Sequence, residues 1–350
     1  MHLLDTVLRR VFHWRVPSYL FLVSVFLLTG SLWCIKATRL QLDNSNSLIS
    51  GLQNQGFNGP PLIKFYRNND FEFTKPLRIV ETTQTPTNLS NLKEEITKQI
   101  NSDTQGGNIL QASVYFRKLN DPGAVNINSG EKYNPGSLMK IPVMLTCLKE
   151  SMNDKSLLER KIHFPGHNSI LPNEYGAYAV LLPGQSYKIR ELIEFMIIDS
   201  DNDAMGLLYE FLGQEKLNKV FTEFGIKIPS YNKPSFDMAP IEFSRFMYVL
   251  YNSTYLDPEH SDFALKTLSK AKYNKSVTRN LPKDVQVAHK YGVAYMNQIK
   301  YLSESAIVFL LGEPYILVVM TSGNDYDRQS DVISKISDIT YKSISKQNIN

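Results

Sequence analysis

Cysteine is scarce in this sequence: the 350 residues include two, Cys34 and Cys147. Two thiols exclude a disulfide-dense scaffold and a zinc site made of four cysteines. The six histidines show no H-E-x-x-H spacing, so a metal centre of that kind is not expected. The excess of positive charge is only +4, and it is too dispersed to predict a nucleic-acid partner. We therefore expect neither metal nor nucleic acid.

One long uncharged apolar run lies near the N-terminus, where residues 17–35 read PSYLFLVSVFLLTGSLWCI. These 19 residues are long enough to cross a bilayer, whereas the apolar part of a signal peptide is usually shorter. Arginines precede the run, which places residues 1–16 in the cytoplasm and the remaining chain outside, in the cell envelope. We expect a single-pass membrane anchor at 17–35; a cleaved signal and a buried helix are the alternatives.

Composition changes again after the apolar run. Residues 40–60 are polar and rich in Gly and Asn, so we interpret residues 36–85 as an extracytoplasmic stalk. Apolar fragments in 61–85 suggest that its last part packs on a domain. Hydrophobic residues make up 43% of the chain, which is typical of globular proteins. The folded domain is expected to comprise residues 86–350.

Helix and strand signals in this domain come in blocks. A capped helix is expected from 88 to about 100, and the middle of the chain, 137–275, is mostly helical. Strands are expected at 109–118, in a short segment after it, and at 284–291, 305–311 and 314–322, before a last helix at 326–346. This order predicts an α/β fold of the α+β type. A five-stranded antiparallel sheet comes from both ends of the chain, flanked by N- and C-terminal helices, with an all-helical lobe inserted and a cleft between the lobes.

A first candidate for chemistry is the S-x-x-K string Ser137-Leu138-Met139-Lys140. On a helix the serine and lysine share a face, and a buried lysine amine can take the proton of the serine hydroxyl. The helix N-terminus favours negative charge on the oxygen. Alone the string carries little weight, because S-x-x-K begins at six serines: Ser90, Ser129, Ser137, Ser230, Ser269 and Ser343.

The second candidate is Ser200-Asp201-Asn202, which occurs once. Ser200 could shuttle a proton close to the nucleophile, and the amide of Asn202 could hold a substrate carbonyl. The alternative is a polar helix start, because Ser, Asp and Asn are favoured N-caps.

The third candidate is Lys290-Tyr291-Gly292, on a predicted strand. A lysine there could hold a substrate carboxylate, and the glycine leaves room for a substrate along the strand edge. The N–H groups of Val293 and Ser137 could then form an oxyanion hole. The alternative is an ordinary strand end with a solvated lysine.

Together, in the order S-x-x-K, S-D-N and K-x-G, these motifs resemble those of the penicillin-recognising active-site-serine hydrolases, and class A β-lactamases most closely. The resemblance covers about residues 88–346. Two phrases also look like that family: LLPGQSYKIRELIEFMIIDSDNDAMGLLYEFLG and VAHKYG…AIVFLLGEPYILVVMTSG. The expected sheet and helical lobe agree with the family's fold.

The resemblance implies an acyl-enzyme mechanism, with a β-lactam or a D-Ala-D-Ala peptidoglycan stem peptide as substrate. It implies catalytic roles for Ser137, Lys140 and Ser200, and substrate-binding roles for Asn202, Lys290, Gly292 and Val293. Tyr175 or Tyr178 could wall the cleft, although a packed loop aromatic is an equal alternative. No cofactor is implied, since nucleophilic acyl transfer needs none. We expect a monomer.

The sequence also departs from the family. Class A enzymes carry an E-x-x-L-N string whose glutamate activates water for deacylation, and no such string follows the S-D-N motif here. The stretch 225–241 is short, and its one acid, Asp237, is a candidate water activator or a turn residue. We therefore expect slow deacylation, typical of a penicillin-binding D,D-peptidase. A non-catalytic module that binds cell-wall peptide or β-lactam is the alternative.

Three residues next to the motifs are also unusual. Tyr291 stands where Thr or Ser is more frequent in the family, so a hydroxyl near the substrate carboxylate is lost or moved. Pro142 is expected to kink the first turns beside Ser137. His289 is expected to point away from Lys290, because neighbouring side chains alternate between the faces of a strand.

Overall fold

The computed structural model describes residues 63–68, 70, 73–166, 175, 180–228 and 237–347. The expected cytoplasmic segment 1–16 and membrane anchor 17–35, with Cys34, lie outside these residues. Among the helices of the described part, none is long and apolar enough to cross a bilayer. The localisation therefore stays a prediction.

A five-stranded antiparallel sheet organises the described part of the chain, in the spatial order β4-β3-β9-β8-β7. Its strands are β3 (Gln111–Lys118), β4 (Ala124–Ile127), β7 (Val287–Met296), β8 (Ile299–Val308) and β9 (Tyr315–Gly323). Strands from the two ends of the chain meet where β3 pairs with β9. The sheet predicted from the sequence is confirmed.

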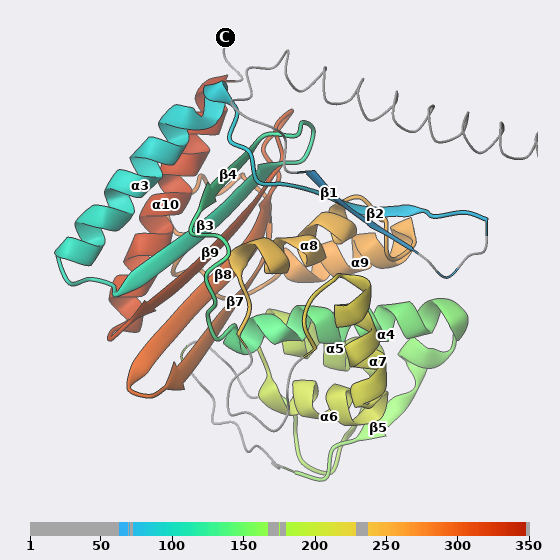
Figure 1. Ribbon diagram of the computed structural model, residues 1–350. Coiled ribbons are helices and arrows are strands. Elements are labelled where there is room, and N and C mark those ends of the chain that lie inside the picture. Colours follow the sequence, from blue (N-terminus) through green and yellow to red (C-terminus); the bar gives the residue numbers. More distant parts are fainter. Residues whose placement is uncertain are drawn as a thin grey trace, which may run out of the picture. The chain divides into compact units, whose positions relative to one another are not determined.

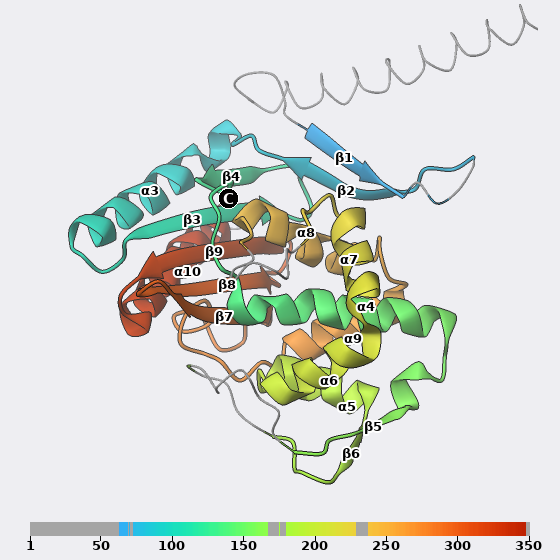
Figure 2. The same ribbon diagram turned by 60° about the horizontal axis from the view of Figure 1, so that its bottom comes forward.

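Helices cover the sheet on both faces (Figures 1 and 2). The N-terminal helix α3 (Ser90–Gln105) and the C-terminal helix α10 (Tyr326–Gln347) lie side by side on one face. The inserted lobe lies on the other face and consists of α4 (Lys140–Asn153), α5 (Ile189–Ile198), α6 (Asn202–Leu212), α7 (Gln214–Glu223), α8 (Pro240–Tyr251) and α9 (Pro258–Leu268). Short elements complete it: β5 (Lys161–His163), β6 (Ser186–Lys188) and the 3-10 turn η3 (Leu157–Glu159).

Alternation along the strands divides the buried side chains into two cores. On β9, Ile316 and Val318 pack toward the lobe, whereas Leu317 and Val319 pack toward α3 and α10. Because both faces are covered, the strand is apolar at nearly every position rather than at every second one. The site described below lies on the lobe side of this sheet.

Strands β7 and β8 are longer than the sequence signals indicated, because they form one continuous hairpin. Met296 pairs with Ile299, which leaves a two-residue turn, Asn297-Gln298. Both turn residues have positive φ, 52° and 65°, as in the tight turns that match the twist of paired strands. Pairing therefore continues past Tyr291, the predicted end of the first strand.

Part of the predicted stalk is folded. Strands β1 (Ile63–Arg67) and β2 (Leu77–Thr82) form a separate hairpin. Ile79 of β2 is buried in the core of the lobe. The expected stalk therefore includes a folded segment, because Ile63–Arg67 and Leu77–Thr82 pair with each other and Ile79 and Tyr66 pack on the lobe.

A buried ion pair attaches this hairpin to α8. Arg245 donates from Nε to Glu81 at 2.7 Å, and its Nη1 donates to the carbonyl of Phe224 at 3.0 Å. The guanidinium also lies over the ring of Tyr66, 4.5 Å from its centroid. The side chains of Arg245 and Glu81 are 7% and 3% exposed. Each charge is therefore shielded from water and is compensated by the other.

We expect Arg245→Met to lower the free energy of unfolding by about 3–5 kcal/mol, because Glu81 would remain as an unpaired buried charge. Urea unfolding of the purified protein measures the change. The double variant Arg245→Met/Glu81→Leu should recover part of the loss. Lys98→Ala, which breaks the exposed Lys98–Glu94 pair, is the control and should change little. A loss in Arg245→Met as small as that in Lys98→Ala would show that the ion pair does not anchor the hairpin.

Candidate active site

The serine of the S-x-x-K string lies in the 3-10 turn η2 (Gly136–Met139), directly before α4. Ser137 is partly exposed there, whereas Lys140, the first residue of α4, is fully buried. Pro142 lies in the first turn of α4, where the missing N–H costs little. The expected break beside Ser137 takes the form of this change from 3-10 to α-helical geometry.

Two glycines bring the turn η2 into backbone contact with β7. A Cβ on Gly292 would lie 2.1 Å from the carbonyl oxygen of Pro135 and 3.0 Å from the nitrogen of Ser137. A Cβ on Gly136, whose φ is +51°, would lie 2.1 Å from the carbonyl oxygen of Val293. Only glycine permits such approach, so the backbone N–H groups of Ser137 and Val293 come from adjacent segments, as an oxyanion hole requires.

Lys140 reaches from α4 to the S-D-N motif. Its Nζ donates to the carbonyl oxygen of Ser200, to Ser200 Oγ at 3.0 Å and to Asn202 Oδ1 at 2.7 Å. These three acceptors hold the amine inside the protein without a carboxylate among them. The lysine of the first motif and two residues of the second thus meet at one point.

The S-D-N motif is a strained turn at the start of α6. Ser200 has a φ of +57°, a left-handed conformation that is uncommon for a residue other than glycine. Asp201 stabilises it as the N-cap: its carboxylate accepts from Ala204 N at 2.8 Å and from Val180 N at 2.6 Å. The N-cap interpretation is thus right for Asp201, while Ser200 and Asn202 point to Lys140.

Lys290 approaches the same hydroxyl from the sheet. Its Nζ donates to Ser200 Oγ at 3.0 Å and to the carbonyl oxygen of Tyr291 at 3.0 Å, and the side chain is 1% exposed. Burial, and then the positive charge of Lys140, hold the pKa of Lys290 well below its usual value; the negative charge of Glu304 opposes them. Ser200 Oγ therefore bridges two buried lysines.

All seven residues predicted for the site converge, although they come from η2, α4, the start of α6 and β7. Of the catalytic candidates, Ser200 accepts from Lys140, and Ser137 lies one turn before Lys140. The substrate-binding candidates surround them: Asn202 and Lys290 through hydrogen bonds, and Gly292 and Val293 through backbone contact with η2. A partly exposed serine, a buried lysine, a bridging hydroxyl and two backbone donors suit nucleophilic acyl transfer. Among the described residues, no cluster of His, Cys, Asp and Glu is suited to a metal ion.

A family model described as the beta-lactamase enzyme family matches residues 91–344. The chain belongs to this family. The family model is described as an enzyme family, which agrees with the serine-hydrolase class expected from the three motifs.

Individual relatives agree with the family. The D-alanyl-D-alanine carboxypeptidase DacF of Bacillus subtilis (strain 168) is 31% identical over 123 residues, which are 33% of this chain and 31% of DacF. The chain thus matches about a third of the length of this curated relative. Among solved structures, PBP-A is similar with 23% identity and a TM-score of 0.64, over 74% of this chain and 97% of PBP-A. A class A β-lactamase from Bacteroides cellulosilyticus has 21% identity and a TM-score of 0.63, over 73% and 99% of the two chains. These structures share the fold.

Other predicted residues of this family member lie away from the bridging hydroxyl. Tyr291 faces α10 and stacks on Tyr273, with ring centroids 3.9 Å apart. The hydroxyl group that the family more often has at this position is thus replaced by an aromatic ring, which also lies 4.1 Å from the Lys290 amine. Tyr175 donates to Asp327 at 2.5 Å, and Tyr178 lies outside the described residues. Asp237 is exposed, next to Met238, which pairs with Tyr133.

His289 points away from Lys290, as strand alternation predicts. Its Nδ1 lies 2.7 Å from Glu304 Oε1, and both side chains are buried. Sequence reasoning missed Glu304 and Tyr273. A signal for the first was present, because Glu304 is the one acid within the otherwise uncharged β-rich stretch 301–312.

We expect Gly292→Ala to lower the free energy of unfolding by about 1–3 kcal/mol, because the new methyl group would overlap backbone atoms of Pro135 and Leu138. The matched control is Gly206→Ala on the exposed face of α6, where nothing lies within 4 Å. That change should instead stabilise the protein by about 0.5–1 kcal/mol. Thermal and urea unfolding compare the two; equal signs would contradict the backbone contact between η2 and β7.

Proposed function

We propose that the protein is a membrane-anchored, penicillin-binding serine hydrolase of the cell envelope that forms an acyl-enzyme on Ser137. The observation that carries the proposal is the position of Ser200 Oγ, 3.0 Å from both Lys140 Nζ and Lys290 Nζ. This arrangement joins the three motifs in one path for a proton. The substrates that fit are β-lactams and peptidoglycan peptides that end in D-Ala-D-Ala.

Acylation uses residues that are in place. The Oγ of Ser137 attacks the substrate carbonyl, and a C–O bond forms as the C–N bond of the amide breaks. A neutral Lys140 amine, with one of its three acceptor contacts opened toward Ser137, takes the proton of Ser137. It then passes a proton to Ser200 Oγ as Ser200 gives its own proton to the departing nitrogen. The N–H groups of Ser137 and Val293 stabilise the oxyanion. Lys290 attracts the substrate carboxylate, and Asn202 holds a substrate amide.

Among the residues that the structure describes, no base for deacylation is evident. No E-x-x-L-N string follows the S-D-N motif, and the acid of the short stretch before α8, Asp237, is exposed. Water attack on an ester of Ser137 needs a group that removes a proton from water. We therefore propose that a β-lactam stays bound as a long-lived ester. This behaviour suits a D,D-peptidase more than a β-lactamase.

Two comparisons support this ranking. DacF is named as a D-alanyl-D-alanine carboxypeptidase, and a variant of PBP-A is described as an acyl-enzyme complex with penicillin G. The placement outside the membrane rests on residues 17–35 and the arginines before them. A peptidoglycan substrate requires that placement, because the cell wall lies outside the cytoplasmic membrane.

We expect incubation with benzylpenicillin to give a persistent mass increase on the intact chain, since acylation is possible and deacylation is slow. Ser137→Ala should abolish the increase. The matched control is Ser269→Ala, which removes the serine of another S-x-x-K string, exposed at the end of α9; it should react like wild type. Labelling that survives in Ser137→Ala would contradict the assignment. Absence of labelling with drug hydrolysis would indicate a β-lactamase, and absence of both would favour the non-catalytic module.

We expect acylation by a carboxylate-bearing β-lactam to slow as pH rises through the depressed pKa of Lys290. A lysine is charged below its pKa, so a lowered pKa moves the loss of charge to a lower pH than for an ordinary lysine. The second-order rate of acylation as a function of pH measures this. In Lys290→Arg the decline should disappear, because a guanidinium stays charged. A wild-type rate that stays constant into the alkaline range would show that Lys290 keeps an ordinary pKa.

A further inference from the structure

Behind the candidate site, on the α10 face of the sheet, lies a buried carboxylate. Glu304 is 0% exposed and occupies β8 opposite Tyr291, the strand neighbour of Lys290. One oxygen, Oε1, lies 2.7 Å from His289 Nδ1, and the other, Oε2, accepts from the backbone N–H of Val277 at 3.0 Å. Both carboxylate oxygens therefore have hydrogen-bond partners. The carboxylate is fixed on the α10 face of the sheet, opposite the residue that follows Lys290 on β7.

Several groups face Glu304 from the elements packed against it. From β7 it meets His289 and Tyr291, and from β9 its register partner is the apolar Val319. From the segment before β7 it meets Tyr273, whose pKa is raised by burial and by Glu304. From α10, the neutral Ser330 lies near Tyr273, and Asp327 adds a second, weaker negative influence on that tyrosine. On the same face, Lys275 lies over the ring of Tyr175, which packs edge-on against Tyr273.

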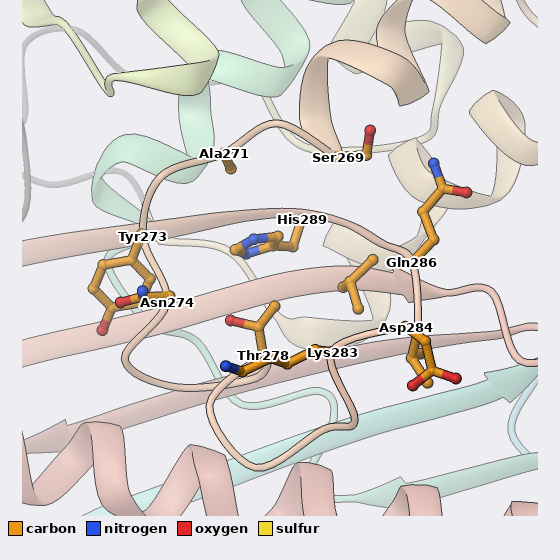
Figure 3. Close-up of a pocket in the computed structure, with 11 residues that line it drawn as sticks. Ser269, Ala271, Tyr273, Asn274, Thr278, Lys283, Asp284, Gln286 and His289 are labelled. Carbon is orange, nitrogen blue, oxygen red and sulfur yellow. The ribbon is translucent and has the colours of Figure 1, made fainter.

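His289 lines a cavity that Glu304 does not line. This cavity of about 430 Å³ lies beside β7 and is lined by His289, Tyr273, Thr278 and the segment 283–287, among others. Figure 3 shows His289 between the strand and the loop that carries Ala271 and Tyr273. Water in the cavity thus reaches the imidazole first, and the carboxylate keeps a low-dielectric environment in which charges act over longer distances.

The amine of Lys290 is the group that a buried counter-charge would stabilise. Lys140 and Lys290 approach the same hydroxyl, and the contacts of Lys290 among the described residues are Ser200 Oγ, the carbonyl oxygen of Tyr291 and the Tyr291 ring, 4.1 Å from Nζ. None of these carries negative charge. Burial of an ammonium without such a charge favours the neutral amine, which could not attract a substrate carboxylate.

We propose that Glu304 is a positioning residue for the acyl-transfer site: from the opposite face of the sheet, its buried negative charge keeps Lys290 protonated for substrate binding. His289 and the N–H of Val277 hold the carboxylate in place for this role. The function of Lys290 in substrate binding belongs to the proposed function, whereas its protonation can be measured without any substrate.

The test compares charge with shape at one position. Glu304→Gln keeps the size of the side chain and removes the charge, whereas Glu304→Asp shortens it and keeps the charge. The readout is the NMR titration of Lys290 in the full chain in detergent with ¹³C-labelled lysine, assigned by the signal that Lys290→Arg lacks. We expect Glu304→Gln to raise the acid dissociation constant of Lys290 about tenfold, one pKa unit. Glu304→Asp should raise it much less.

Two controls separate this effect from general damage. Asp103→Asn removes another buried carboxylate, on α3, that pairs with Lys335 at 3.0 Å; Lys290 should titrate as in wild type. His289→Gln keeps the charge of Glu304 and should not raise the dissociation constant of Lys290. If Glu304→Gln does not fold, judged by near-ultraviolet circular dichroism, Glu304→Asp and His289→Gln still test the proposal.

An unchanged titration in Glu304→Gln would overturn the proposal. So would a shift in Glu304→Asp or His289→Gln of the size expected for Glu304→Gln, because either would indicate a role in packing rather than charge. Acylation by benzylpenicillin is the second readout: in Glu304→Gln the decline of the rate with rising pH should begin about one pH unit lower than in wild type. If wild type is not acylated at all, the proposed function fails, and the titration of Lys290 still decides the role of Glu304.

Discussion

One serine hydroxyl shared by two buried lysines is the constraint on which the rest of this structure depends. Ser200 Oγ lies 3.0 Å from both amines, and each amine comes from a different layer, Lys140 from the helical lobe and Lys290 from the sheet. Holding two buried amines beside one oxygen is unfavourable unless the surroundings are rigid and supply acceptors. The left-handed turn at Ser200, its N-cap Asp201 and the carbonyl oxygens around the amines meet that need.

The same constraint explains why glycine occurs twice at the junction of lobe and sheet. Gly136 and Gly292 let the backbone of η2 lie directly against β7, which brings Ser137 beside the strand that carries Lys290. A side chain at either position would push the layers apart and separate the nucleophile from the amines. Backbone contact, rather than side-chain packing, thus sets the width of the site.

Much of this arrangement could be predicted from the sequence, since motifs and strand signals are local. The order of helix and strand blocks gave the sheet with its inserted lobe, and alternation on β7 gave opposite directions for His289 and Lys290. Features that depend on distant pairing could not be read in the same way. The turn Asn297-Gln298 lacks the glycine that usually marks a tight hairpin, so β7 and β8 were expected to be shorter. Strands β1 and β2 were assigned to a stalk because Ile79 becomes buried only through contacts with the distant lobe, while Phe65 and Leu77 stay exposed. Glu304 was overlooked because its partners come from another strand and from the segment before β7.

The pairing of β3 with β9 has a consequence for folding during synthesis. Lys118 pairs with Tyr315, so the central strands join only after the whole lobe between them has been made. Closing so long a loop is slow, and contacts distant in sequence delay folding. A chain that leaves the ribosome N-terminus first therefore carries Ser137 long before it carries Lys290, and it cannot complete the sheet until the last strand has emerged. A chain exported through the membrane would then assemble its reactive centre only on the far side, with no active enzyme formed before it reaches its destination.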